Sequence, residues 1–584
     1  MTKPLRITGQ TGDYGTWRQF SEWGGAEAPR LLFNSLTGDP SLPEGLLGGI
    51  LTYRGINLPR LFEGTWITLT WPEWFSELAA LEDMALAHPD ESVFLENPSF
   101  VRRYAAQCVQ IRHPETTFTT QANWSLSEAA QHIPPTAYRF LRLGRNLLRA
   151  ARNLTAERVE SGGSRCAFFP WSAKIAPHIL PVAEAWSHRY NQPVFLAGWN
   201  QEAPIDMQEG WVWSNLSREI SPHLILEAWR ADVQLRRKWR WALNAGRLDA
   251  LENWHGWDLR PIVIPFLQRT IDHLLPVLLS ILVAEAWCLH FRIQAVVLPS
   301  DGGEAIRALI AGARLAGVPS FGIQYGFATN NPEIGEPFED LLFLWGSTTR
   351  EWYIRRGASP QKVVVVGTTA YDSVIRMQKH REHLRQELAQ RFGLDPSQRW
   401  VIMATWHVQA VYTQATKEAE LDLVVKTIYY MKAGCLLFKL HPSDQGRGEL
   451  EELYAERYGV EAPIITDVGL NEQLMLAADV LICNYTTLAS MAIAVQTPVI
   501  IVDLSGQQPC HRAYVDDGVA EFADTTSSLE VALRETLTDK TTYWKNRFDA
   551  WQNYIAKHLQ NLDGLAGERI YDLISAWLSS NNSA

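Results

Sequence analysis

The sequence predicts an α/β protein whose sheets are parallel, and two observations carry this prediction. Residues 436–501 contain three short apolar strands, Leu436–Leu440, Val480–Cys483 and Pro498–Val502, separated by segments long enough for helices. Because strands that alternate with helices run parallel, the helices are expected to form the crossovers of one sheet. An earlier stretch, residues 166–324, repeats the alternation and predicts a second sheet.

Length and composition place the chain among globular enzymes. A chain of 584 residues is too long for one hydrophobic core, so we expect two to four domains. Its apolar content of 46% and charged content of 20% are ordinary for a folded protein. A net charge of −11 argues against bulk binding to nucleic acid, although local basic patches are compatible with it. The six cysteines show no metal-type spacing, which favours a reduced, intracellular protein.

Residues 1–158 are predicted to form an N-terminal α/β extension, to which the sequence assigns no chemistry. Strand-like pieces at Trp66–Thr70 and Ser92–Leu95 alternate with helical patterns at Pro72–Ala87 and Ser125–His132. The end of this segment predicts a cationic amphipathic helix able to lie on an anionic membrane surface. Its basic residues stand at helical spacing: Arg139, Arg142, Arg145, Arg149 and Arg152. The alternative is a solvated arginine face, packed onto the protein by the leucines beside it.

No segment is predicted to cross a membrane. The most apolar run, Leu274–Trp287, is too short to span a bilayer and contains Glu285. The start of the chain lacks the apolar stretch of a signal peptide. We therefore expect a cytoplasmic protein that contacts the inner face of the membrane at most peripherally.

The first sheet domain is predicted to begin with a strand, a helix and a second strand. The strands are expected at Cys166–Phe169 and Pro193–Ala197, and the helix over residues 177–190. A basic, tryptophan-rich helix over residues 230–247 is expected to be exposed with its tryptophans buried, and a long apolar helix is expected over Pro265–His290. Two further strands of this sheet are expected at Ala295–Leu298 and Ser320–Gln324.

Polar side chains follow two strands of the predicted C-terminal sheet where each strand ends. Lys439 and His441 close the first strand, and Asn484, Thr486 and Thr487 follow the second at the start of a helix. Ligands of parallel sheets bind at the carboxyl ends of the strands, where loops and helix N-termini present N–H groups. A cation, an imidazole and two hydroxyls there predict a site for phosphate or a nucleoside diphosphate. The alternatives are a histidine packed before the strand-ending proline and a lysine that faces solvent.

Motifs in this half of the chain resemble those of GT-B glycosyltransferases, nearest to the branch of CDP-glycerol glycerophosphotransferases and capsule polymer transferases. The His441-Pro442 pair and the turn at residues 484–487 are similar to the HP pair and the D-Y-S-S-like turn of that branch. The branch's W-G and G-x-P-x-Y-D patterns are matched in part by Trp345, Gly346, Gly367, Tyr371 and Asp372. The resemblance covers roughly residues 165–503 and implies a GT-B architecture, with two Rossmann-like parallel-sheet domains that face a cleft.

The GT-B resemblance also implies how the chain is divided. Residues 159–385 would form the acceptor-side domain, and residues 386–525 would form the domain that binds the nucleotide of the donor. Residues 526–584 would form a helical tail that packs back on the first GT-B domain. The extension at residues 1–158 lies outside the resemblance.

Catalytic roles follow from the same resemblance. The family's G-H-x-x-P segment falls on His178, with Pro177 where glycine is usual, and its histidine is the general base in inverting members. Whatever the family, a neutral imidazole at a helix N-terminus facing a cleft has a pKa near the working pH. Asp301 would orient this histidine, and Thr405 and His407 would lie in the loop over the donor phosphates. The alternatives are a capping histidine without chemistry and an N-cap role for the aspartate.

Two departures from the family pattern bear on the reaction. Tyr325, before Gly326, replaces the histidine of the family's acceptor-side Q-H-G, and Asn484 removes the negative charge of the D-Y-S-S-like turn. The segment after the turn, residues 486–495, offers no carboxylate of the kind that retaining members use, which favours inversion. Because no DxD stands in a strand-end loop, no metal is expected. We expect no other cofactor, since the nucleotide-activated donor is a substrate.

The sequence therefore predicts an inverting, metal-independent glycosyltransferase or polyol-phosphate transferase of cell-surface polysaccharide or glycolipid synthesis. Its partners would be a nucleotide-sugar donor and a glycan or lipid-linked acceptor. One alternative is a catalytically silent nucleotide-sugar-binding subunit of a polysaccharide assembly system. Another is a UDP-sugar 2-epimerase, whose S-D-S-G-G segment is nevertheless missing near Asn484.

Overall fold

The computed structural model describes most of the chain. The described residues are 5–7, 28–37, 45–63, 71–87, 92–96, 100–121, 144, 147–148, 165–191, 193–200, 202–299, 303–326, 336–406, 413–441, 444, 448–484, 486–504 and 513–581. Trp66–Thr70 and Ser125–His132 of the predicted extension lie outside them, as does the arginine-rich segment 139–152 apart from three isolated positions.

The first large sheet has seven strands, and every pairing in it is parallel. Its strand order is β12-β11-β10-β9-β6-β7-β8, with β6 and β9 at the centre. The strands are β6 (Arg165–Phe168), β7 (Val194–Gly198), β8 (Trp211–Asn215), β9 (Ile293–Pro299), β10 (Ser320–Ile323), β11 (Leu341–Leu344) and β12 (Val363–Val365).

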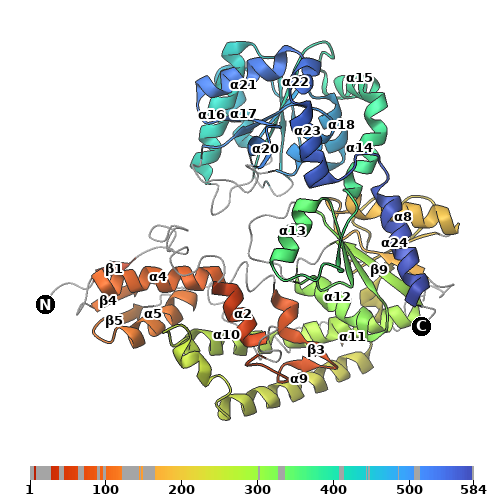
Figure 1. The fold of residues 1–584 in the computed structure, drawn as a ribbon. Helices are drawn as coiled ribbons and strands as arrows, with labels where there is room; N and C mark the ends of the chain where they lie inside the picture. Colours follow the sequence, from red (N-terminus) through yellow and green to blue (C-terminus); the bar gives the residue numbers. More distant parts are fainter. Residues whose placement is uncertain are drawn as a thin grey trace.

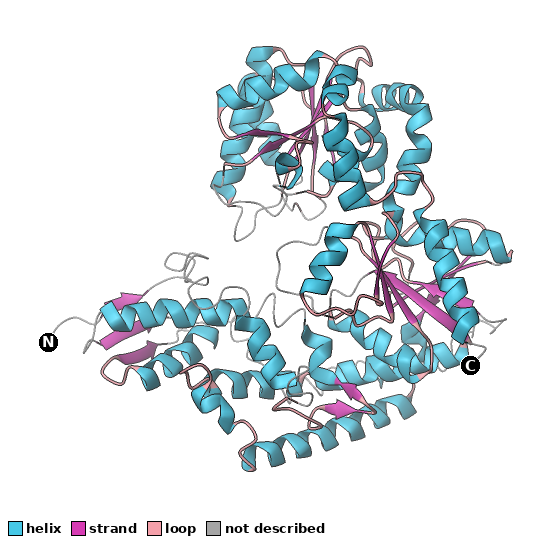
Figure 2. Cartoon of the chain, viewed as in Figure 1, coloured by secondary structure: helices cyan, strands magenta, loops and turns pink. Residues whose placement is uncertain are grey.

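The second large sheet has six strands and is also parallel throughout. Its order is β15-β14-β13-β16-β17-β18. The strands are β13 (Trp400–Ala404), β14 (Cys435–Lys439), β15 (Ile464–Ile465), β16 (Val480–Cys483), β17 (Val499–Val502) and β18 (Glu521–Ala523). Two parallel sheets, each with its own helices, confirm the predicted α/β class (Figures 1 and 2).

Each sheet buries both faces, which explains why central strands such as β13, β16 and β17 are apolar along their whole length. Along β13, Val401 and Met403 enter one core while Trp400 and Ile402 enter the other, because successive side chains point to opposite faces. The helices of this domain are α15 (Arg381–Phe392), α16 (Gln414–Met431), α17 (Glu449–Tyr458), α18 (Asn471–Ala477), α19 (Leu488–Ala494), α20 (Ala513–Asp516), α21 (Thr526–Thr538), α22 (Lys540–Asn546) and α23 (Phe548–Tyr554).

The first sheet is covered by long helices on one side and by the C-terminal helix on the other. Val296 and Leu298 of β9 pack toward the core that contains α11 and α12, while Ala295 and Val297 face the core of α8 and α24. The helices are α8 (Ala176–Tyr190), α9 (Pro222–Asn244), α10 (Arg260–Asp272), α11 (Leu274–His290), α12 (Glu304–Leu315), α13 (Ser347–Arg355) and α24 (Ala566–Asn581). The short helix α14 (Asp372–Met377) follows the first sheet in the chain but packs in the core of the second.

The single apolar helix predicted over Pro265–His290 is wrong, because the structure has two helices, α10 and α11, that meet at His273. Pro276 explains the break: proline has no N–H and clashes with the carbonyl four residues earlier, so it is tolerated in the first turn of a new helix. Among the described residues no single helix is long and apolar enough to cross a membrane; α10 and α11 pass that test only as a pair bent by 46°.

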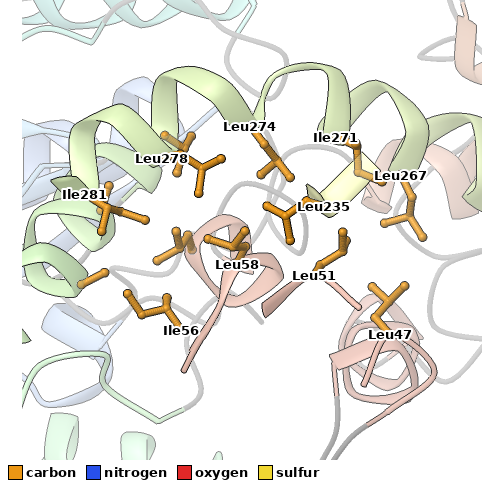
Figure 3. Close-up of a cluster of buried hydrophobic side chains, with 14 of the residues drawn as sticks. Leu47, Leu51, Ile56, Leu58, Leu235, Leu267, Ile271, Leu274, Leu278 and Ile281 are labelled. Carbon is orange, nitrogen blue, oxygen red and sulfur yellow. The ribbon is translucent and has the colours of Figure 1, made fainter. Parts of the chain in front are cut away.

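The N-terminal extension shares its core with the first sheet domain. Its elements include α2 (Ala28–Thr37), α4 (Trp71–Ala87), α5 (Phe100–Arg112), a hairpin of β2 (Thr52–Tyr53) and β3 (Ile56–Asn57), and a parallel sheet of β1 (Leu5–Ile7), β4 (Ser92–Glu96) and β5 (Thr117–Gln121). Figure 3 shows Leu51 and Leu58 of the extension close to Leu235 of α9, below the leucines and isoleucines of the α10–α11 pair. Ion pairs of Arg54 with Glu285 and of Arg307 with Glu63 join the same parts.

The C-terminal helix α24 packs on α8 of the first sheet domain (Figure 1). The Asp372 carboxylate accepts hydrogen bonds from the N–H groups of Ala566 (3.0 Å) and Gly567 (2.7 Å), and so caps the start of α24. The two helices approach so closely that a Cβ on Gly567 would lie 2.8 Å from the carbonyl carbon of Pro181. Asp372, one of the motif residues, therefore has a structural partner 194 residues away.

Asp372→Ala is expected to lower the melting temperature, because it leaves two buried N–H groups of α24 without an acceptor. Loss of such a cap costs about 1–2 kcal/mol. Scanning calorimetry measures the change, with Asp395→Ala as the control, since that exposed carboxylate serves only the local turn at Ser397. Equal losses in the two variants would contradict the capping role.

Candidate functional site

The register of three neighbouring strands brings the predicted donor residues to one edge of the second sheet. In the ladders, Ala404 of β13 is paired with Lys439 of β14 on one side and with Cys483 of β16 on the other. Thr405 and Asn484 follow these paired positions directly, and the Thr405 N–H donates to the Lys439 carbonyl at 3.0 Å. Because all three strands are parallel, this is the carboxyl edge, where ligands of such sheets bind.

Lys439 is buried at that edge, so the alternative of a solvent-facing lysine is wrong. Its Nζ donates to the Leu440 carbonyl at 3.0 Å. Burial lowers the pKa of its ammonium group, and the carboxylate of Asp467 opposes that shift. An anionic ligand would further stabilise the charged form of this buried cation.

His441 begins a turn that is fixed by a buried ion cluster. The Asp444 N–H donates to the His441 carbonyl at 2.9 Å, and the His441 ring lies 4.9 Å from the Trp406 ring. Lys417 of α16 holds the same turn, because its Nζ lies 2.6 Å from an oxygen of Asp444 and 2.8 Å from one of Glu451. The position of the imidazole therefore depends on a lysine one helix away.

Asn484 is buried and is oriented by a second residue of α16. Its Nδ2 donates to Glu420 Oε1 at 2.8 Å, and the same carboxylate oxygen accepts the Leu504 N–H at 3.3 Å. Since a carboxylate only accepts, the amide must turn its Nδ2 toward Glu420 and its Oδ1 away. Within the described part of the chain, neither that Oδ1 nor the buried Thr405 hydroxyl has a hydrogen-bond partner. An oxygen acceptor thus survives at the position where the family's aspartate would stand.

Tyrosine hydroxyls from two distant parts of the chain hold the turn before α19. The Tyr371 hydroxyl donates to the Thr487 carbonyl, and the Tyr514 hydroxyl donates to the Thr486 carbonyl, each at 3.4 Å. The Thr486 hydroxyl accepts the Leu488 N–H at 3.2 Å. Tyr371 follows the last strand of the first sheet and is buried in the core of the second, so its bond connects the segment between the two sheets with this turn.

His178 lies in the first turn of α8, and its ring is half-buried. The ring stacks on Trp345, with 5.8 Å between centroids and 7° between planes, and Thr369 donates to its carbonyl at 2.6 Å. Its Nδ1 is inaccessible and has no partner among the described residues. Burial lowers the pKa of His178 to about 4, with a smaller contribution from the charge of Lys174. The imidazole is therefore neutral at physiological pH, with a pKa well below the value near working pH that the sequence suggests.

An aromatic chain connects His178 with the donor edge. Trp345 lies between the His178 ring and Tyr371, whose ring centroid is 6.1 Å away and whose hydroxyl reaches Thr487. Gln324 fixes Trp345 through two bonds of 2.9 Å and donates to the Gly326 carbonyl at 2.7 Å. The structure thus links His178, Gly326 and the turn before α19 through a few contacts.

The remaining predicted site residues are placed only in part. Tyr325 is partly exposed, beside the buried Gln324. Asp301 and His407 lie outside the described residues, as do the five arginines of the predicted membrane helix. In the described ranges, no three histidine, cysteine, aspartate or glutamate side chains are grouped so that they could hold a metal ion.

Lys417, Glu420 and Gln324 were not predicted as site residues. A lysine and a glutamate three residues apart on a helix usually form an exposed pair, so the local sequence resembles a solvated face. Their burial depends on residues distant in sequence, Asp444 and Glu451 for Lys417 and Asn484 for Glu420. Local periodicity carries no signal for such contacts.

Comparisons with known proteins find similarity to solved structures alone. No family model and no curated protein matches the chain. The wall teichoic acid polymerase TagF is similar in structure at 10% identity and a TM-score of 0.46, over 79% of this chain and 100% of that one. Two UDP-GlcNAc 2-epimerases also match, from Neisseria meningitidis (12%, TM-score 0.45, 71% and 100%) and from Methanocaldococcus jannaschii (17%, TM-score 0.38, 52% and 83%).

At identities of 10–17%, the similarity to these solved structures concerns the fold alone. The roles of individual residues rest on the contacts of this chain.

Lys417→Met is expected to destabilise the donor domain by roughly 3–5 kcal/mol, because two carboxylates then lose their buried cation. The midpoint of the urea transition measures this effect. Arg534→Met, which breaks the exposed pair with Glu530 on α21, is the matched control and should cost at most about 0.5 kcal/mol. A Lys417→Met midpoint as high as that of the control would show that the cluster does not fix the turn.

His178→Phe is expected to weaken the pH dependence of stability between pH 6.5 and pH 4. The pKa of His178 is about 4 in the folded protein and about 6.5 in the unfolded chain. The native state therefore binds the proton only at a lower pH than the unfolded chain does. Stability supplied by the neutral ring is thus complete above pH 6.5 and is lost as the pH falls toward 4.

Phenylalanine keeps the stack on Trp345 but cannot titrate. Melting temperatures of both proteins at pH 7.5 and pH 5.0 provide the measurement. An equal drop in the two proteins would mean that the ring is not desolvated as described.

Proposed function

We propose that this chain is an inverting, metal-independent GT-B transferase that uses a nucleotide-activated sugar or polyol donor in cell-surface polymer or glycolipid synthesis at the cytoplasmic side of the membrane. The observation that carries the proposal is the convergence of Lys439, Thr405 and Asn484 at one carboxyl edge, beside the turns of His441 and Thr486. Such an edge suits a nucleoside diphosphate, because the leaving diphosphate is an anion.

Donor binding would use groups of different kinds. Lys439 supplies a buried positive charge, the His441 imidazole a hydrogen bond, and the hydroxyls of Thr405 and Thr486 further donors. Asn484 Oδ1 accepts, so it suits an N–H or a hydroxyl of the nucleoside or sugar. Because Lys439 is already buried in the free protein, binding of the donor does not have to remove water from this ammonium group.

Acceptor activation is assigned to His178. A group with a pKa near 4 is a weak base on its own, but a bound diphosphate would raise that pKa because it stabilises the imidazolium. The base would thus gain strength when the donor is in place, which would limit donor use in the absence of an acceptor.

The second candidate function is a silent nucleotide-sugar-binding subunit. The low pKa and the inaccessible Nδ1 of His178 favour it, because both oppose proton transfer in the free protein. The two candidates share the donor edge and differ only in turnover.

Thermal-shift measurements with CDP-, UDP-, GDP- and CMP-linked donors test the proposal. One nucleotide class is expected to raise the melting temperature by several degrees, since a ligand that binds only the native state stabilises it. His441→Ala should abolish the shift, because it removes a ligand to the diphosphate. His178→Ala should keep the shift and lower turnover about 100- to 10,000-fold, the usual contribution of a general base.

Lys545→Gln, an exposed change on α22, serves as the control and should alter neither quantity. Full turnover by His178→Ala would refute the base assignment. A normal shift without turnover in the wild type, with every acceptor offered, would favour the silent subunit, and the lack of a shift with all four donor classes would contradict both.

A further inference from the structure

The outer side of α9 is a cationic surface that contributes no residue to the candidate site. Positions three, four or seven residues apart share one side of a helix, and here they form a single exposed face. The α9 face consists of Leu226, Arg230, Gln234, Arg237, Lys238, Arg240 and Trp241, all of them exposed. Trp241 is 58% exposed, which corrects the expectation that the tryptophans of this helix are buried.

The opposite side of α9 anchors the helix, so its outer face has a fixed orientation. Leu235 and Trp239 enter the core shared with the N-terminal extension, and the Trp239 indole donates to Gln268 at 2.7 Å. Arg236, the inward cation of the run, is neutralised by the carboxylates of Asp232 and Asp272. The basic residues that remain belong to the outer face.

Within the described parts of the chain, few carboxylates lie near the positive charge of the α9 face. Glu227, at the border of the face, already accepts from the Tyr53 hydroxyl and lies near Arg54. Among the described residues, Arg230, Arg237 and Arg240 form no ion pair. A chain with a net charge of −11 thus carries a concentrated patch of the opposite sign along a helix of 23 residues, about 34 Å long.

We propose that the α9 face docks on an anionic lipid bilayer. Cations near such a surface attract it, and long basic side chains can keep their charge at the headgroups while their stems lie deeper. α9 lies along the outer edge of the molecule, far from the donor sheet, so docking would leave that sheet free (Figure 1). The proposal does not depend on the transfer reaction.

The apolar members of the face favour a bilayer over a soluble polyanion. Leu226 and Trp241 lie on the same side as the cations and are 48% and 58% exposed. Tryptophan is enriched at the boundary between headgroups and acyl chains, where an amphipathic helix buries its apolar side chains. Arg247 stands over the Trp241 ring at 6.0 Å and extends the cationic surface past the end of the helix.

Vesicle flotation with the full-length protein tests the proposal. Wild type is expected to bind vesicles of phosphatidylcholine with 30% phosphatidylglycerol and to bind pure phosphatidylcholine weakly. Arg230→Gln/Arg237→Gln/Lys238→Gln/Arg240→Gln should weaken binding by roughly fivefold per cation, several hundredfold in all, and should reduce its salt dependence. Trp241→Ala should weaken binding while leaving the salt dependence unchanged.

The matched control is Arg355→Gln/Lys379→Gln/Lys426→Gln/Lys545→Gln, which removes the same charge from exposed positions elsewhere and should bind like the wild type. Four outcomes would overturn the proposal: no binding by the wild type, wild-type binding by the α9 variant, an equal loss in the control, or binding to single-stranded nucleic acid in preference to vesicles.

Discussion

The register of β14, β13 and β16 is the constraint on which the candidate site depends. A parallel ladder fixes which residues are neighbours at its end, and here it places Lys439, Thr405 and Asn484 beside one another. A shift of one residue in either ladder would send each side chain to the opposite face of the sheet. The buried cores on both faces, formed by residues such as Val401 and Ile402, make such a shift costly.

Side chains of helix α16 fix the positions of the loops that follow the strands at this edge. Lys417 fixes the turn after β14 through Asp444, and Glu420 fixes Asn484 after β16 together with the Leu504 N–H. One helix face therefore ties together the loops of three strands. A buried lysine between two carboxylates is a poor source of net stability, so its value lies in holding one arrangement of the turn. Tyr371, from the segment that follows the last strand of the first sheet, adds a further contact to the turn before α19.

Local pattern in the sequence was enough for much of the fold. β16 was predicted with its observed bounds and β14 within one residue, because both are short apolar runs between turn residues. The break at His273 was missed, since Pro276 lies inside an apolar run that looks like one helix. Long-range contacts explain the other misses: burial of Lys439, the orientation of Asn484 by Glu420 and the low pKa of His178 each depend on residues distant in sequence.

A structure of the chain with a bound nucleotide donor tests the central claim most directly, because that claim concerns where the diphosphate lies. The account predicts that the diphosphate oxygens lie within hydrogen-bond distance of Lys439 Nζ and the Thr405 hydroxyl, with the nucleoside or sugar near Asn484 Oδ1. A donor bound away from the carboxyl edge of β13, β14 and β16, with these side chains untouched, would contradict it.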